Sequence, residues 1–200
     1  MIDKIAQHYT ELYEIYGDSA QACQYGSEES QIFRFKQLIQ VADLHGANIL
    51  DLGCGRGSMY GYLEKMAIST SYTGIDLVEG TLSLARQRFS QARFIKRDIL
   101  CEPLDESFDY VFLNIVFNNR FDEADCEHDD YMYTLLKAAF QHCTKGMAFN
   151  FISTYVNFVD DEMAYHDPTQ VLKFCIEQLS RKVYMMHHYE RCDVAVFVYK

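Results

Sequence analysis

Apolar and polar residues form short blocks along the chain, and the spacing within each block predicts an element. Residues 3–16 carry apolar side chains at helical spacing, and Gly17-Asp18 should end that helix. A second helix is predicted from the cap residue Ser27 to about Leu44. Beyond it, strands are predicted at 47–51, 71–76, 92–96, 108–113, 146–152, 183–188 and 194–199, and helices at 58–67, 78–89, 129–143 and 168–179.

This alternation of strands and helices predicts an α/β protein with a doubly wound, mostly parallel sheet and helices on both faces. Only the four residues Tyr189–Cys192 separate the last two strands. A parallel crossover needs a much longer connection, so this pair should form an antiparallel hairpin. No repeat or linker interrupts the pattern, so we expect one domain over residues 1–200, with residues 1–45 as a helical cap over its ligand site.

Composition narrows the class of protein. Hydrophobic residues make up 49% of the chain and prolines number two, which excludes a disordered chain. No apolar run approaches the roughly 20 residues of a membrane span, and the N-terminus lacks the pattern of a secretory signal. The seven cysteines include no C-x-x-C pair. An odd number of scattered thiols indicates a reduced, cytoplasmic protein.

The formal net charge is −11. Proteins that bind nucleic acid usually present a basic face to the phosphates, and anionic membranes also attract positively charged protein surfaces. The acidic balance therefore argues against DNA, RNA and membrane as partners. A small molecule is the expected substrate.

The segment Ile49–Gly57 contains the most specific chemical signal. A buried strand ends in Asp51 and breaks into a loop with glycines at 53, 55 and 57. Alternate glycines let the backbone take positive φ and lie against a ligand, and the following helix points its N-terminus at the same place. The loop is not the G-x-G-x-x-G of dinucleotide sites, because Ser58 stands where that pattern needs glycine, and no phosphate-binding lysine follows it.

Polar residues also stand at the carboxyl ends of the other central strands, where open α/β sheets bind their ligands. Asp76 lies about 20 residues beyond the loop, the spacing at which an acid accepts from both ribose hydroxyls. Asp98 can accept from an adenine amino group, and Asn114 ends the fourth strand. Asp51 would attract the ammonium of a methionine moiety.

At these residues the chain resembles class I S-adenosylmethionine-dependent methyltransferases, over roughly residues 26–200. The loop from Asp51 to Gly57 is similar to the family's first motif, 72–77 to its second, 94–99 to its third, and 108–114 to its fourth strand. The resemblance implies a Rossmann-like seven-stranded sheet of order 3-2-1-4-5-7-6 with the last strand antiparallel. The cofactor would be S-adenosylmethionine and the product S-adenosylhomocysteine. The implied cofactor-binding residues are Arg34, Asp51, Gly53, Cys54, Gly55, Gly57, Asp76, Leu77, Asp98, Ile99 and Asn114.

The segment Tyr25–Phe35 is similar to a subgroup that acts on small molecules; in it, Gln31 is an alternative to Arg34 for the cofactor carboxylate. Residues 114–117 lack the Asn-Pro-Pro-Tyr run of enzymes that methylate amino groups of nucleic acids. Oxygen, nitrogen, sulfur and carbon acceptors all remain open. The candidate substrate contacts are Tyr16, Asn118 and Tyr155. The candidate bases are His128, His166 and Tyr155, and for each of them the sequence favours a structural or surface role over that of a base.

Three other interpretations of these residues are open: an oxidoreductase, a non-catalytic subunit and a metal site. A nicotinamide-dependent oxidoreductase shares the loop and the ribose acid but needs a different glycine spacing and usually a longer chain. A non-catalytic partner subunit should have lost the glycines. A metal site would have to draw on 126–130 or on His187-His188, but the spacing fits no structural zinc pattern, so no metal is predicted.

Overall fold

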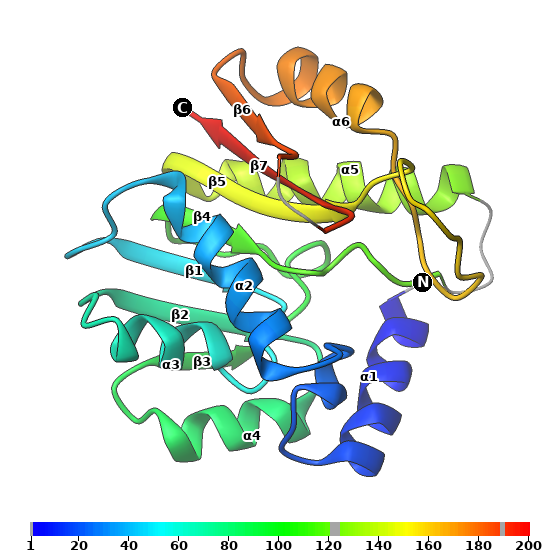
Figure 1. The fold of residues 1–200 in the computed structure, drawn as a ribbon. Coiled ribbons are helices and arrows are strands. Elements are labelled where there is room, and N and C mark those ends of the chain that lie inside the picture. The colour runs from blue at the N-terminus through cyan, green and yellow to red at the C-terminus, as the bar shows by residue number, and fades with distance from the viewer. Residues whose placement is uncertain (1, 121–124, 189–190) are drawn as a thin grey trace. The chain divides into compact units, whose positions relative to one another are not determined.

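The computed structural model describes residues 2–120, 125–188 and 191–200. Seven strands form a sheet of order β3-β2-β1-β4-β5-β7-β6, which confirms the predicted Rossmann-like class (Figure 1). The chain divides into two compact units, Met1–Asp98 and Ile99–Lys200.

The first unit contains three parallel strands and four α-helices. Leu50 is paired with Thr73 between the first two strands, and Ile75 with Ile95 between the second and third. The predicted second helix is wrong at its end: it turns into a 3-10 turn at Ile39 instead of continuing to Leu44. The elements are α1 Ile2–Tyr16, α2 Glu28–Leu38, β1 Asn48–Leu52, α3 Ser58–Lys65, β2 Ser71–Asp76, α4 Glu79–Arg88 and β3 Arg93–Lys96.

The second unit contains β4 Phe108–Leu113, α5 Asp125–Gln141, β5 Cys143–Ile152, α6 Pro168–Phe174, β6 Val183–Met186 and β7 Asp193–Tyr199. Strands β4 and β5 are parallel, whereas β7 is antiparallel to both β5 and β6, which confirms the terminal hairpin. Several boundaries differ from prediction. Helix α6 ends at Phe174 and passes into a π-helical turn over Cys175–Leu179, although the sequence predicts an α-helix that runs to residue 179. Strand β6 ends at Met186, two residues before the predicted end, and α5 ends two residues early at Gln141. Helix α5 begins four residues earlier, and β5 begins three residues earlier because Cys143 pairs with Phe108 beside a bulge.

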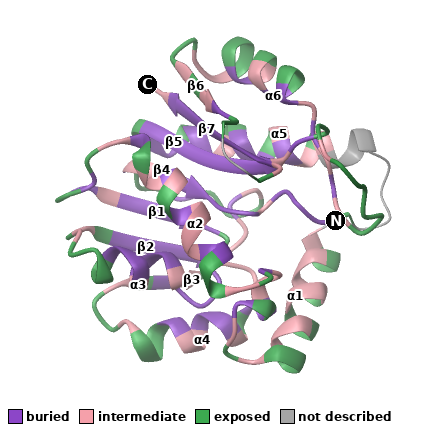
Figure 2. Cartoon of the chain, viewed as in Figure 1, coloured by how far each residue is buried: buried purple, intermediate pink, exposed green. Residues whose placement is uncertain are grey.

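The strands form the interior of each unit (Figure 2). In the first, Ile49 and Leu50 of β1 are fully buried, and in the second Phe112 and Phe149 are fully buried. Strands covered on both faces read as continuous apolar runs, as observed here. Polar side chains inside such runs therefore need a specific reason.

Gly74 lies in the middle of β2, where the backbone passes close to the side chain of Cys54. A Cβ at this position would lie 2.7 Å from the Cys54 Sγ atom and 2.8 Å from the Phe94 ring. Because neither neighbour sits at the end of a flexible chain, we expect Gly74→Ala to lower the free energy of unfolding by about 1–3 kcal/mol. Urea denaturation checks this. The control is Gly26→Ala, where a Cβ meets nothing within 4 Å and a change under about 0.5 kcal/mol is expected. Equal stability of the two variants would contradict this account of the packing.

Candidate active site

The glycine loop between β1 and α3 has the conformation predicted from its sequence. Gly53, Gly55 and Gly57 have φ values of +77°, +53° and +76°. The backbone N–H groups of Gly53 and Cys54 both donate to the carbonyl of Ile75, at 2.8 and 3.0 Å, which ties the loop to the end of β2. Substitution of any of the three glycines would place a side chain in a region of φ that L residues rarely adopt.

Asp51 is the last residue but one of β1 and is 3% exposed. Its carboxylate accepts a hydrogen bond from the hydroxyl of Tyr72 on the neighbouring strand. Burial raises the pKa of Asp51 to about 7, although the Tyr72 hydrogen bond opposes the shift, and the charge of Asp76 adds to it. A cation beside this carboxyl group would offset the cost of ionising it in a buried position.

Asp76 ends β2 and organises the backbone on both sides of itself. One carboxylate oxygen accepts from the Gly55 N–H at 2.7 Å, and the other accepts from the Val78 N–H at 2.9 Å. Burial raises the pKa of Asp76, while these backbone donors and that of Leu77 lower it. Each carboxylate oxygen has a second lone-pair site, so the group can still accept from two adjacent hydroxyls.

Two thiols lie beside this loop. A Cβ on Gly55 would lie 3.1 Å from the Cys23 Sγ atom. Burial, reinforced by the charge of Asp76, raises the pKa of Cys23 to about 11 and that of Cys54 well above its ordinary value. Thiols that resist ionisation are poor nucleophiles, so Cys54 fills space in the loop.

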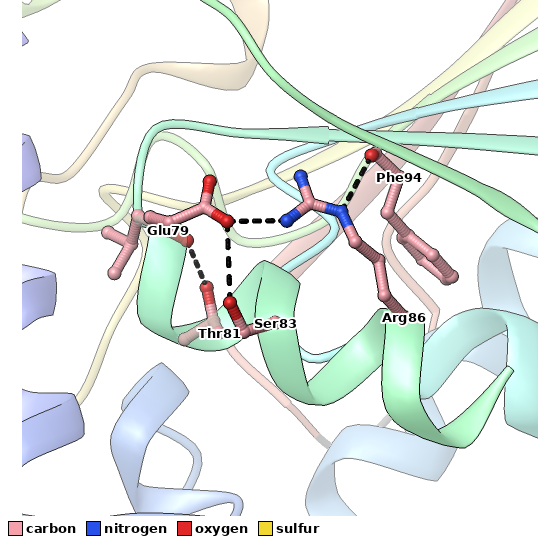
Figure 3. Close-up of polar contacts among 6 residues, drawn as sticks. Glu79, Thr81, Ser83, Arg86 and Phe94 are labelled. Carbon is pink, nitrogen blue, oxygen red and sulfur yellow. Dashed lines mark hydrogen bonds and ion pairs between the residues drawn. The ribbon is translucent and has the colours of Figure 1, made fainter.

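Helix α4 is fixed to β3 by Arg86, which lies on the side of the helix that meets the strand (Figure 3). Its Nε donates to the Phe94 carbonyl at 3.1 Å, and its guanidinium pairs with Glu79 in the first turn. Thr81 donates to the Val78 carbonyl at 2.9 Å. These contacts hold the turn after Asp76 in place. Asp98, two residues beyond β3, is half-buried, and the next residue, Ile99, is buried.

Arg56 connects the glycine loop to the N-terminal segment of the same unit. Its buried guanidinium lies 2.7 Å from a carboxylate oxygen of Asp18 and 3.7 Å from one of Glu28. Asp18 also pairs with Arg88 of α4. One acid between α1 and α2 thus binds both the loop and the helix that follows β2.

The predicted carboxylate contact, Arg34, lies on α2. Its Nη1 donates to the Ser30 hydroxyl at 2.6 Å, and its guanidinium lies 5.8 Å from the centre of the buried Tyr25 ring. Burial raises the pKa of Tyr25 well above the usual value, and the charges of Cys23 and Asp51 contribute to the shift. Tyr25 therefore lies within electrostatic range of the loop acid. Gln31 is buried on the same helix.

The carboxyl ends of β4 and β5 in the second unit hold a buried pair of asparagines. Asn150 of β5 accepts at its Oδ1 from the Ile115 N–H at 2.6 Å and donates from its Nδ2 to the Asn114 Oδ1 at 2.7 Å. Ile115 has a φ of +59°, which is strained for a β-branched residue. Strain of this kind is concentrated at functional sites.

Asn118 follows in the same turn and is 4% exposed. Its backbone carbonyl accepts from the Ala164 N–H at 3.0 Å, but its buried side-chain Oδ1 has no hydrogen-bond partner among the residues that the structure describes. Buried polar atoms without partners are rare and call for an explanation. A donor on a bound molecule would supply one.

His166 is 2% exposed and has both ring nitrogens engaged. Nδ1 lies 2.7 Å from a carboxylate oxygen of Asp129, and Nε2 lies 3.1 Å from the Phe117 carbonyl. The ring also packs edge-on against Phe151, with ring centres 5.9 Å apart. These contacts tie the loop after β5 to the turn after β4, which favours a structural role over that of a base.

We expect His166→Ala to lower the free energy of unfolding by about 2–4 kcal/mol, because it removes two hydrogen bonds and buried ring packing. Thermal denaturation checks this, with the exposed His187→Ala as a control that should change stability little. A variant as stable as the parent that lacks methyl transfer would instead assign His166 as the base.

The tyrosines predicted as substrate contacts, one of which is also a candidate base, are more exposed than His166. Tyr155 is 69% and Tyr16 49% exposed. The side chain of His128 lies outside what the structure describes. Over the described residues, no three His, Cys, Asp or Glu side chains are grouped so that they could hold a metal ion.

Sequence reasoning did not assign three residues of this region: Tyr72, Arg56 and Asp18. It placed Asn150 only as part of the segment 149–155, which is expected to line the substrate pocket. Asn150 carried a signal, because it is a single amide inside the buried run Phe149–Phe151. Tyr72 carried none, since a tyrosine in a strand is an ordinary core residue.

Comparison with known proteins identifies the class. The family model described as a methyltransferase domain matches residues 49–146. A candidate methyltransferase of Mycobacterium tuberculosis is 29% identical over 82% of this chain and 98% of its own length. The magnesium protoporphyrin IX methyltransferase of Synechocystis PCC 6803, solved with bound S-adenosylhomocysteine, superposes over 100% of this chain and 99% of its own, with a TM-score of 0.69 and 13% identity.

The chain belongs to the class I S-adenosylmethionine-dependent methyltransferases, and its cofactor is S-adenosylmethionine. It is therefore an enzyme of that class and not a nicotinamide-dependent oxidoreductase. A shorter match, 32% identity to the fatty-acid O-methyltransferase of Mycolicibacterium smegmatis, covers 42% of this chain but only 31% of the relative. In the part of the chain that the structure describes, no helix has the length and apolar character needed to cross a membrane.

Proposed function

We propose that this methyltransferase acts on a small molecule, which it binds at the carboxyl ends of β4 and β5. The buried Asn118 Oδ1, which has no partner among the described residues, carries this proposal, because a donor group of the acceptor would satisfy it. The net charge of −11 supports a small molecule over a nucleic acid. We also propose a cytoplasmic location, in keeping with the six cysteines that the structure describes as free thiols.

The glycine loop and strand ends of the first unit suit the cofactor. We propose that Asp51 and the loop hold the methionine end, that Asp76 accepts from the ribose, and that residues 1–45 form a cap held by Arg56. The loop can approach a ligand closely because its glycines present no Cβ. The remaining proposed contacts are Arg34 for the carboxylate, Asn114 at the substrate edge, Cys54 and Leu77 beside the loop and ribose, and Asp98 and Ile99 at the adenine.

S-adenosylmethionine supplies a methyl group already activated on a sulfonium sulfur. The residues of this chain therefore need to align the acceptor with that carbon and exclude water. A base is needed only where the acceptor keeps its proton until the transition state. Tyr16, Asn118 and Tyr155 are the proposed substrate contacts, and His128, His166 and Tyr155 remain the candidate bases.

Transfer of labelled methyl groups tests the small-molecule proposal. The enzyme is incubated with methyl-tritiated S-adenosylmethionine and, separately, with total RNA, with unfolded protein, and with a deproteinised cell extract. We expect label only in the small-molecule extract. Label in RNA or protein alone would overturn the proposal.

A further inference from the structure

Residues 18–28, which connect α1 to the start of α2, form a strap against the glycine loop of the same unit. The short 3-10 turn in the strap brings the Cys23 Sγ atom to 3.1 Å from the position that a Cβ on Gly55 would take. The backbone N–H groups of Cys23 and Tyr25 both donate to the Ala20 carbonyl, at 3.0 and 3.1 Å. The middle of the strap is thus a compact turn that can move as one piece.

The strap lies within electrostatic range of both acids that we propose to hold the cofactor. Burial is the main cause of the raised pKa of Cys23, and the charge of Asp76 adds to it. Burial likewise raises the pKa of Tyr25, and the charge of Asp51 contributes. A cofactor bound between the loop and these acids would lie beside the strap, so its exchange with solvent would require the strap to move.

Arg56 of the glycine loop fastens the strap at both ends. Its Nη1 lies 2.7 Å from a carboxylate oxygen of Asp18, the first residue of the strap. Its Nη2 lies 3.7 Å from a carboxylate oxygen of Glu28, the last residue. Asp18 also pairs with Arg88 at the end of α4. A single buried guanidinium of the cofactor loop therefore joins the two ends of the strap.

This fastening can open at little cost. The side chains of Asp18 and Glu28 are 38% and 72% exposed, so water can replace Arg56 as their partner. The buried Arg56 Nε has no hydrogen-bond partner among the described residues, and water would satisfy this donor once the strap opened. Gly17 has a φ of +55°, and a Cβ on Gly17 or Gly26 would meet nothing within 4 Å. The backbone near each end can therefore turn without a clash.

The helices on either side of the strap have anchors of their own. The ring of Tyr13 in α1 lies against Gly80 of α4, where a Cβ would be 2.5 Å from the ring. Phe35 and Leu38 of α2 are buried in the unit. The strap is therefore a separately fastened segment between two anchored helices, which is the arrangement that a gate requires.

We infer that the strap gates the cofactor site. Arg56, through its pairs with Asp18 and Glu28, sets the rate at which S-adenosylmethionine enters and S-adenosylhomocysteine leaves. The ion pairs join protein groups only, so they close the strap equally with and without the cofactor. Loss of one pair should raise both rates and leave the affinity nearly unchanged. Arg56 acts on the cofactor through the strap and is a positioning residue.

Surface plasmon resonance with the full chain immobilised measures association and dissociation rates of S-adenosylhomocysteine. Asp18→Asn is expected to raise both rates about tenfold and to change the affinity less than about threefold, because the buried guanidinium loses its nearer carboxylate. Asp18→Glu keeps the charge and should restore both rates to within about threefold of the wild type. The control, Glu14→Gln, removes the same charge from an exposed position of α1 and should change neither rate.

Glu28→Gln tests the other end of the strap and covers the case in which Asp18→Asn does not fold. Its pair is longer and more exposed, so a rise of about threefold in both rates is expected. Unchanged rates in either folded variant would overturn the gate, and so would a rise in the dissociation rate alone.

The inference rests on the proposed cofactor site in the first unit. The same measurement separates the two proposals, because the wild-type protein reports on the site and the variants report on the gate. A folded wild-type protein that binds no S-adenosylhomocysteine would contradict the site itself. Normal binding by the wild type with unchanged rates in the variants would remove only the gate.

Discussion

Asp76→Ala is expected to weaken S-adenosylmethionine binding by at least about 100-fold. Two hydrogen bonds from ribose hydroxyls to a carboxylate contribute about 1.5–3 kcal/mol each, and 1.4 kcal/mol corresponds to a factor of ten. The substitution also removes the acceptor for the Gly55 and Val78 N–H groups. Calorimetric titration measures the affinity directly.

Two controls separate the ribose contact from the shape of the loop. Asp109→Ala removes an acid that lies 3.0 Å from Lys145 in the other unit, and it should change affinity less than twofold. Adenosine should lose affinity in the Asp76 variant, while 2′,3′-dideoxyadenosine should bind equally weakly to both proteins. An Asp76→Ala protein with wild-type affinity would disprove the ribose assignment.

Cofactor affinity is also expected to depend on pH through Asp51. The folded-state pKa of this acid is raised to about 7 from 3.8, so its proton stabilises the folded protein at low pH and is lost as pH rises through about 7. Burial makes ionisation of Asp51 unfavourable in the free protein, but only the ionised carboxylate attracts the ammonium and sulfonium groups of the cofactor. Below pH 7 the proton must leave on binding, so affinity should fall nearly tenfold per pH unit, about thirtyfold by pH 5.5.

Variants of Asp51 and Tyr72 identify the group that makes cofactor affinity depend on pH. Asn cannot titrate, so Asp51→Asn should bind weakly with a flat pH profile. Tyr72→Phe removes the hydrogen bond that lowers the pKa of Asp51, so the loss of affinity should begin at a higher pH. Calorimetry from pH 5.5 to 8.5 checks all three proteins. Equal affinity of the wild type across that range would rule out Asp51 as the group that meets the cation.

The sequence was sufficient for the element order, the terminal hairpin and the loop conformation, because each depends on local patterns. Alternating glycines determine the loop, and a four-residue connection determines the hairpin. Element boundaries were less certain because they depend on partners. The sequence predicts Cys143 as the end of a helix and residues 144–145 as loop, yet the pairing of Cys143 with Phe108 makes all three residues strand.

The side-chain hydrogen bonds of Asp51 and Asn150 could not be predicted, because they depend on strand register and on side-chain rotamers. Tyr72 reaches Asp51 only because β1 and β2 are parallel with Ile49 opposite Tyr72. Asn150 was visible as a polar residue in a buried strand, but its partners lie 35 and 36 residues away. Sequence spacing indicated where chemistry is concentrated, and the structure supplied the orientation of each group.

We propose that the glycine loop and the acids Asp51 and Asp76 of the first unit form the S-adenosylmethionine site. Calorimetric titration of the folded protein with S-adenosylmethionine, S-adenosylhomocysteine and a nicotinamide dinucleotide tests it most directly. We expect stoichiometric, micromolar binding of both sulfur nucleotides and no binding of the dinucleotide. Failure of the folded protein to bind either sulfur nucleotide would contradict it.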